Sequence, residues 1–376
     1  TDVCPLVPIA NIEMDEVVKY AHKLGERVGK ELGIPGYFYE YAASTEERRN
    51  LAVVRKGEYE ALEAKLVDPA WQPDFGPAEF VKAKHTGATA ISARDFLIAY
   101  NVNLNTTSTR RANAVAYDIR EKGRIKRVGE VLSGAIVKDA DGNTLWTPGK
   151  LKHVKAIGWY IEEYGVTQVT MNITNITETP LHLAFDETAK AANARGIRAT
   201  GSELVGLVPK SAMLEAGKYF LRKQNRSTGI HESELIKIAI KSMGLDELGP
   251  FIPEERIIEY MLESGTDKKL VDLSLTDFAN ETASESPAPG GGSISAYAGA
   301  LGISLATMVA NLSAHKRGWD ERWEEFSDWA DKGQILKDEL LFLVDEDTNS
   351  FNKIMEAMRL PKGTDTEKKA RKEAMD

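Results

Sequence analysis

The sequence predicts a mixed α/β region followed by a region built only of helices. Up to about residue 262, short apolar stretches with a period of two alternate with amphipathic helical patterns. From Leu273 onward every periodic stretch has helical spacing. We therefore expect an α/β fold, more closely an α+β portion in two parts, and then an all-α helical bundle. A chain of 376 residues has room for two or three domains.

Composition excludes several classes of protein. The 48 basic and 57 acidic residues give a net charge of −9, which argues against nucleic-acid binding as the main role. A single cysteine, Cys4, excludes an internal disulfide and suits a reducing compartment. The six histidines show no zinc-finger, His-Glu-x-x-His or His-x-Glu spacing, and we expect no metal site.

The first elements read as helix, strand and helix. Apolar residues with helical spacing predict a helix over 15–32, which Gly33 and Pro35 end. The aromatic run 37–41 predicts a strand. Ser44-Thr45-Glu46-Glu47 has the pattern of a capping box, so we expect it to open the next helix.

A strand with one polar face follows over 98–105. Ile98 and every second residue after it are apolar, whereas Asn101, Asn103 and Asn105 lie on the opposite face. These asparagines could bind a polar ligand or simply face water, and facing water is the commoner arrangement. Further elements are predicted along the chain: a helix capped by Ser108, a hairpin over 137–146, strands over 154–161, 166–173 and 197–200, and helices over 180–192 and 232–243.

The helical region contains predicted helices over 276–283, 293–312 and 319–360. The segment 293–312 carries no charge and is long enough to cross a membrane. It is rich in Ala, Gly and Ser, however, and large apolar residues do not dominate it. We therefore expect a helix packed closely on all sides inside a bundle, with no membrane span.

The glycine-rich stretch 287–293 precedes this helix. Gly290, Gly291 and Gly292 allow the backbone to approach a ligand, and Ser293 has the character of an N-cap. A helix N-terminus fed by glycines is a potential anion-binding site. A flexible turn before a capped helix explains the same pattern, and no Gly-Lys-Ser/Thr follows to indicate a nucleotide loop.

Asp347 interrupts an apolar helical stripe. The stripe comprises Leu340, Leu343, Val344, Phe351, Ile354 and Met355. We expect a carboxylate on this face to lose hydration, which would raise its pKa toward the range useful for proton transfer. A buried aspartate satisfied by one hydrogen bond is the alternative.

These blocks together resemble one family. Pro289 to Ser293, the small-residue helix, Leu343 to Asp347 and Met358 to Lys362 resemble, in this order, the cyclodeaminase domain of the formiminotransferase-cyclodeaminase family. The resemblance implies that Asp347 is the catalytic carboxylate. Gly290, Gly291, Gly292 and Ser293 would then supply backbone donors to a folate.

The earlier part of the chain resembles the transferase domain of the same family, through Arg55 to Leu62 and Pro73 to Pro77. The resemblance implies a folate-binding segment from Gly76 to Gly87, although two residues more than expected lie around 82–86. The implied folate-binding residues are Gly76, Pro77, Ala78, Glu79, Phe80, Val81 and Gly87. It also implies four parts: an N-terminal transferase subdomain over 1–91, a C-terminal one over 92–262, a linker over 263–271 and a cyclodeaminase domain over 272–376.

The resemblance implies two reactions of histidine breakdown. The formimino group of N-formimino-L-glutamate would move to tetrahydrofolate, itself polyglutamylated, and the product would cyclise to 5,10-methenyltetrahydrofolate with release of ammonia. No metal or nucleotide is implied, and a cytoplasmic homo-oligomer is expected. The family's transferase histidine would lie just before Thr1, and no histidine here matches its motif. Because the chain has no initial Met and ends within a helical pattern, we expect a piece of a longer protein.

Two competing hypotheses remain. An unrelated α/β enzyme with a helical appendix would require the ordered blocks to be a coincidence. The chain could instead be a catalytically incomplete module that binds folate or assembles an oligomer on the same fold. Asp347 argues against this module, because a scaffold gains nothing from an unpaired buried carboxylate.

A basic cluster near the end is either a solvated helix face or a contact for a polyglutamate tail. The cluster consists of Lys362, Lys368, Lys369, Arg371 and Lys372.

Overall fold

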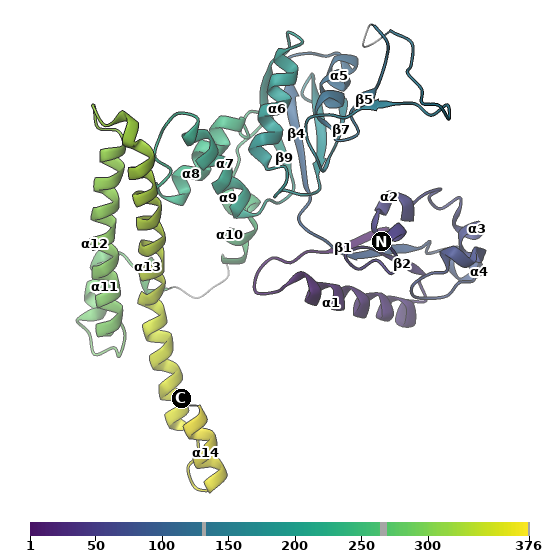
Figure 1. Ribbon diagram of the computed structural model, residues 1–376. Helices are drawn as coiled ribbons and strands as arrows, with labels where there is room; N and C mark the ends of the chain where they lie inside the picture. The colour runs from purple at the N-terminus through teal and green to yellow at the C-terminus, as the bar shows by residue number, and fades with distance from the viewer. Residues whose placement is uncertain (130–132, 264–268, 375–376) are drawn as a thin grey trace. The chain divides into compact units, whose positions relative to one another are not determined.

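The computed structural model describes residues 1–129, 133–263 and 269–374, and the chain forms two compact units, Thr1–Leu97 and Ile98–Asp376 (Figure 1). The predicted fold class is confirmed, because a mixed region of helices and strands precedes a C-terminal region of long helices. The four-part division of the chain stays a prediction. The centre of its linker, 264–268, lies outside the described residues.

The first unit is built on a parallel sheet in the order β1-β3-β2, with β1 at Val3–Leu6, β2 at Gly36–Glu40 and β3 at Thr89–Ala93. The helix α1 (Met14–Arg27) connects β1 to β2 and packs on one face of the sheet, and a wider turn continues it to Leu32. The helix and the strand at 37–41 are therefore confirmed.

Short helices follow β2: α2 (Leu51–Val54), α3 (Leu62–Val67) and α4 (Phe80–Ala83). The predicted capping box is wrong. A short turn begins at Glu46, and its preceding residue, Thr45, makes no side-chain cap. Ser44 instead donates its hydroxyl hydrogen to Asp74 Oδ1 at 2.6 Å, so a tertiary contact replaces the local one.

The second unit begins with an antiparallel sheet in the order β7-β8-β4-β9. Its strands are β4 (Ile98–Leu104), β7 (Val154–Ile161), β8 (Val166–Ile173) and β9 (Ala199–Val205). The helices α5 (Thr109–Ile119) and α6 (Leu181–Asn193) cover one face (Figure 1). The Ser108 side chain accepts a hydrogen bond from the Arg111 N–H, which confirms the predicted cap.

The opposite face of this sheet is polar, and Asn105 is exposed as expected, but Asn101 and Asn103 do not face water. Asn101 is 9% exposed and Asn103 is fully buried, because neighbouring polar side chains cover them. The expectation failed because the sequence shows the alternation of one strand and not the partners that adjacent strands place beside it.

Smaller elements complete this part. β5 (Arg124–Ile125) pairs with β6 (Trp146–Thr147). Within the predicted hairpin over 137–146, Lys138 bridges Thr144 and the chain turns at Gly142, which has a positive φ. Four helices follow β9: α7 (Lys210–Arg222), α8 (Glu232–Met243), α9 (Pro253–Arg256) and α10 (Ile258–Glu263).

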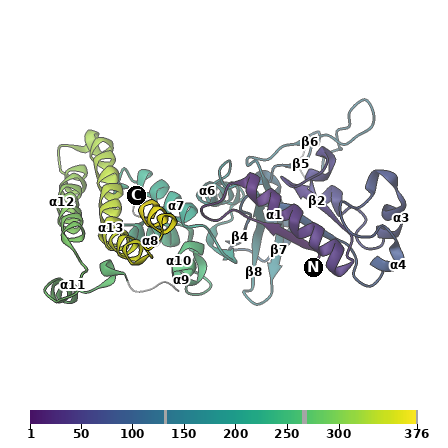
Figure 2. The same cartoon turned by 90° about the horizontal axis from the view of Figure 1, so that it is seen from below.

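The C-terminal helices are α11 (Leu275–Thr282), α12 (Gly291–Ala314), α13 (Trp323–Arg359) and α14 (Asp365–Glu373). α12 and α13 lie side by side in both ribbon views (Figures 1 and 2). Their contact is lined by small residues. At Gly333 a Cβ would lie 2.0 Å from Thr307 Oγ1, so the close approach of the two helices requires glycine there.

The helix pair also packs on the loop between α7 and α8. Thr228 Oγ1 donates to Asp331 Oδ2 at 2.6 Å, and Lys218 Nζ lies 3.1 Å from Asp331 Oδ1. A Cβ at Gly229 would meet the Ala330 Cβ at 2.3 Å. This loop therefore joins the sheet region to the helix pair within the second unit.

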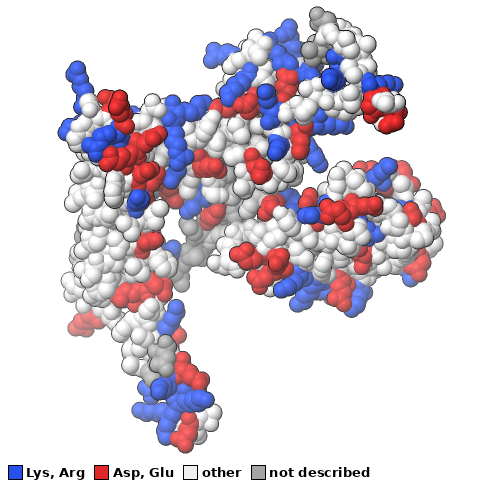
Figure 3. Space-filling model, viewed as in Figure 1, with Lys and Arg blue, Asp and Glu red and all other residues white. Residues whose placement is uncertain are grey.

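The large apolar side chains of α12 point away from α13, so the expectation of packing on all sides is wrong. Leu305 is 61% exposed, and Figure 3 shows that the surface over α12 is largely uncharged. Among the described helices, α12 alone has the length and mean hydropathy to cross a membrane, and only 17% of its apolar window is buried. Length and composition are weak evidence for a membrane span, because core helices of soluble proteins can have the same length and composition.

Candidate functional sites

The glycine-rich stretch and Asp347 meet at one end of the α12–α13 pair. α12 begins at Gly291, with Gly290 as the residue before it, so Ser293 lies in the first turn and is not the predicted N-cap. Ser293 is fully buried, and its hydroxyl donates to the Val344 carbonyl at 2.7 Å. The serine therefore fixes the start of α12 against α13.

Asp347 occupies the N-terminal end of α12. Its Oδ2 accepts a hydrogen bond from the Ser293 N–H at 3.0 Å and lies 3.2 Å from Ser293 Oγ. A helix N-terminus carries a partial positive charge and unpaired N–H groups, which favour an anion. The Asp347 carboxylate therefore occupies the helix N-terminus at which the sequence predicted a potential site for a ligand anion.

Gly292 is required by this arrangement. A Cβ at that position would lie 2.2 Å from Asp347 Oδ1 and 2.5 Å from its Cγ. At Gly291 a Cβ would meet nothing within 4 Å. The last glycine of the three therefore makes room for the carboxylate, which the spacing of the two blocks in the sequence could not show.

The environment of Asp347 differs from the prediction. Its side chain is exposed, and of the six apolar residues in the predicted stripe only Val344 is buried. Leu343, Phe351, Ile354 and Met355 are among the exposed large apolar residues. The helical period correctly identified the face of α13 that turns toward α12. The small side chains of α12 cover only a narrow part of that face, so Asp347 is not buried as expected.

This geometry gives Asp347 a defined chemical capability. One oxygen is held by the α12 N-terminus, and the exposed carboxylate can accept a proton from a ligand or return one. The neighbouring Asp345 is engaged elsewhere, since its Oδ1 accepts a hydrogen bond from the Leu270 N–H at 2.6 Å.

The predicted folate-binding segment lies in the first unit. Gly76 has a φ of +78°, and a Cβ there would lie 2.3 Å from the Ile34 carbonyl oxygen. Glu79 precedes α4, Phe80 packs near the Tyr59 ring, and Val81 is strongly exposed. Pro77 and Ala78 connect Gly76 to Glu79. Among the described residues, neither makes a contact that indicates how a ligand would bind.

A cavity of about 430 Å³ adjoins the end of this segment at Gly87. Gly87 is the one predicted folate residue among its lining residues. Arg55 lies at its wall, with its guanidinium 2.7 Å from Asp2 Oδ2 and 3.1 Å from Glu58 Oε2. Burial, together with the charge of Arg48, lowers the pKa of the Lys65 ammonium, which also lines this cavity.

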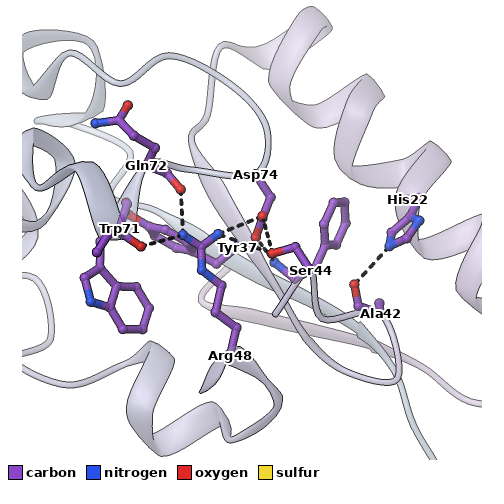
Figure 4. A network of polar contacts seen from close by, with 10 residues as sticks. His22, Tyr37, Ala42, Ser44, Arg48, Trp71, Gln72 and Asp74 are labelled. Atoms are coloured by element: carbon purple, nitrogen blue, oxygen red, sulfur yellow. Dashed lines mark hydrogen bonds and ion pairs between the residues drawn. The ribbon is translucent and has the colours of Figure 1, made fainter. Parts of the chain in front are cut away.

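A buried ion pair fixes the loop that leads into the segment (Figure 4). Arg48 lies 2.7 Å from Asp74 Oδ1 and also donates to the carbonyls of Ala70 and Gln72 at 3.1 and 2.9 Å. Asp74 Oδ2 in turn accepts from the Phe38 N–H at 2.8 Å. Sequence reasoning missed Arg48. The one feature that could have indicated it is that no acidic residue lies three or four positions away to pair with it.

Among the described residues, no group of three or more His, Cys, Asp or Glu side chains is arranged to hold a metal ion.

Three family models match the chain in succession. Residues 1–94 match the N-terminal subdomain of the formiminotransferase domain, residues 99–263 match the formiminotransferase domain, and residues 274–376 match formiminotransferase-cyclodeaminase. The formimidoyltransferase-cyclodeaminase of Gallus gallus is 43% identical over 375 residues, which is all of this chain and 65% of that protein. The chain belongs to the formiminotransferase-cyclodeaminase family.

Two further relatives match smaller shares of the chain. A glutamate formimidoyltransferase of Thermoplasma acidophilum is 36% identical over 241 residues, covering 63% of this chain and 70% of that protein. A methenyltetrahydrofolate cyclohydrolase of Methylorubrum extorquens is 36% identical over 98 residues, 26% of this chain and 47% of that protein. The chain spans about 65% of the length of the two-part family relatives it matches.

Proposed function

We propose that the chain belongs to a bifunctional folate enzyme of histidine degradation. Its first part would transfer the formimino group of N-formimino-L-glutamate to N5 of tetrahydrofolate. Its second part would convert 5-formiminotetrahydrofolate to 5,10-methenyltetrahydrofolate and ammonia. The order of the three matched family models supports both activities, and the position of Asp347 at the α12 N-terminus carries the second.

In the proposed cyclisation, the formimino group begins in its protonated, positively charged form (–CH=NH2+). N10 of the folate attacks the carbon of this group. The new N10–C bond gives a tetrahedral intermediate. Asp347 takes the proton from N10 and gives it to the terminal amine, which leaves as ammonia when its C–N bond breaks. The remaining nitrogen lone pair forms the methenyl cation, and the carboxylate returns to its ionised state.

The Ser293 contacts support this role. Because the Ser293 N–H and hydroxyl both lie at Oδ2, they fix the carboxylate plane and leave Oδ1 for the substrate. A Cβ at Gly290 would lie 3.5 Å from Asp347 Oδ2, and Gly291 follows as the first residue of α12. We propose that their backbone N–H groups face the folate and that tetrahydrofolate, with a polyglutamate tail, is the ligand of a cytoplasmic homo-oligomer.

A second candidate is a folate-binding or assembly module without turnover. The exposed apolar faces of α12 and α13 favour assembly. The argument from an unpaired buried carboxylate no longer weighs against it, because Asp347 is exposed and hydrogen-bonded.

Turnover distinguishes the two candidates. Methenyltetrahydrofolate has a characteristic absorbance, so its appearance from 5-formiminotetrahydrofolate can be followed with the chain and with Asp347→Asn. We expect turnover in the parent and a loss of at least about 100-fold in the variant. The matched control, Asp345→Asn, should retain turnover.

Normal turnover in Asp347→Asn would contradict the assignment of that carboxylate. Folate binding by the parent without any turnover would instead favour the assembly module.

A further inference from the structure

The face of the second unit's sheet opposite α5 and α6 carries an organised set of polar side chains. Strand pairing places Trp159 opposite Gln168, and Gln168 opposite Asn103. In the next row, Asn101 lies opposite Glu203. Side chains paired across antiparallel strands lie about 5 Å apart on the same face, so these five form one patch.

Hydrogen bonds fix the orientation of the amides in this patch. Glu203 Oε2 accepts from Asn101 Nδ2 and from Gln168 Nε2, each at 3.2 Å. Gln168 Nε2 also donates to Asn103 Oδ1 at 2.9 Å, and Asn103 Nδ2 donates to Glu247 Oε2 at 2.6 Å. Because each amide nitrogen faces a carboxylate or amide oxygen, each amide can adopt only one of its two flips.

Two amide oxygens in the patch have no partner among the described residues: Asn101 Oδ1 and Gln168 Oε1. Asn101 is 9% exposed and Gln168 is 1% exposed. A buried acceptor without a donor destabilises the fold, and native structures contain few of them. Both unpaired atoms are acceptors, and the nitrogens of the same two amides already donate to Glu203, so the patch is short of donors.

Trp159 adds a flat apolar surface at the edge of the patch. Its side chain is 56% exposed although it lies in the middle of β7, next to the buried Gln168. An exposed aromatic ring can stack on a planar ligand whose edge reaches the polar groups. The negative charge of Glu203 disfavours a ligand carboxylate at the same place.

We propose that this patch binds a planar N–C–N edge of hydrogen-bond donors. The inference rests on the proposed transferase function, whose two substrates both carry such an edge. One is the 2-amino-N3 edge of the tetrahydrofolate pteridine, and the other is the formimino group of N-formimino-L-glutamate. Glu203 accepts from the donor edge, the unpaired oxygens of Asn101 and Gln168 take the remaining donors, and the Trp159 ring stacks on the plane.

Calorimetric titration of the full 376-residue chain tests the patch with three probes: tetrahydrofolate, 6-methyltetrahydropterin and N-formimino-L-glutamate. We expect Glu203→Gln to weaken binding of the recognised probe by about 10-fold or more, as for loss of a hydrogen bond to a charged group. Trp159→Ala should weaken a pteridine by about 10-fold, and because the ring is exposed this variant should fold. The control is Tyr160→Ala, an exposed neighbour whose side chain leaves the opposite side of β7.

The probes separate the two sources of the donor edge. Glu203-dependent binding of 6-methyltetrahydropterin supports the patch with a pteridine occupant. Glu203-dependent binding of N-formimino-L-glutamate alone supports it with a formimino occupant. If the parent binds tetrahydrofolate or N-formimino-L-glutamate and both variants bind as tightly as Tyr160→Ala, the patch assignment is overturned while the proposed function stands. If the parent binds none of the probes, the proposed transferase function fails and the patch assignment fails with it.

Discussion

In the second unit, the sheet region buries its large apolar side chains, whereas the α12–α13 pair leaves many of them exposed. In the sheet region Met213, Ile119 and Ile173 are fully buried between the strands and the helices α5 to α8. In the helix pair the buried residues are mostly small, whereas Leu305, Phe342 and Ile335 remain at least 60% exposed. A periodic pattern thus identifies the face that must be buried, but it does not say whether this chain supplies what covers it.

The largest expected effect tests this contrast in stability. Met213→Ala should lower the free energy of unfolding by about 2–5 kcal/mol, because it leaves a cavity in a closed core. Leu305→Ala should change it by less than about 0.5 kcal/mol, because the side chain already faces solvent. Urea unfolding monitored by circular dichroism measures both. An equally large loss for Leu305→Ala that depends on protein concentration would show that the outer face of α12 is buried between copies of the chain.

The largest histidine pH dependence should arise from the sheet region, although burial also lowers the pKa of His315 at the end of α12. Burial lowers the pKa of His182 to about 4, and its ring stacks on that of Tyr219 at 4.2 Å. The unfolded histidine, with a pKa near 6.5, binds a proton that the folded one excludes, so stability falls as the pH drops from about 6.5 toward 4. The loss due to His182 should reach about 2 kcal/mol at pH 5.

The matched variant is His182→Phe, which keeps a ring at this position but cannot be protonated. It should remove that part of the acid sensitivity between pH 7.5 and pH 5. His153→Asn serves as the control, since His153 is exposed and Asn tolerates its φ of 55°. An unchanged pH profile for His182→Phe would contradict the burial of a neutral histidine here.

The smallest expected effect concerns helix caps in the two regions. Ser108 caps α5 and Ser274 caps α11, each through a side-chain oxygen that accepts a backbone N–H. Ser108→Ala should lower the global free energy of unfolding by about 1 kcal/mol. Because α11 contains no buried residue, Ser274→Ala should leave that value unchanged and speed amide hydrogen exchange only within α11. Equal global losses would show that α11 unfolds together with the sheet core.

Sequence reasoning reached the fold class, the strands at 154–161 and 166–173 and the Ser108 cap, because these depend on local periodicity and capping. It also selected the glycine stretch and Asp347, which the fold brings into contact. It could not give the role of Ser293 or the exposure of Asp347, because both depend on how closely α12 and α13 approach. It missed the burial of Asn101 and Asn103 for the same reason, since their partners come from other strands and a distant loop.

In the proposed cyclisation, Asp347 acts from the space that Gly292 leaves at the α12 N-terminus. The most direct test compares Gly292→Ala with Gly302→Ala, a second glycine of α12, by the absorbance of methenyltetrahydrofolate formed from 5-formiminotetrahydrofolate. A Cβ at Gly292 would displace the carboxylate, so turnover should fall by about 100-fold, whereas a Cβ at Gly302 would meet nothing within 4 Å and that variant should retain turnover. Equal turnover in the two variants, with α12 intact by circular dichroism, would contradict the account.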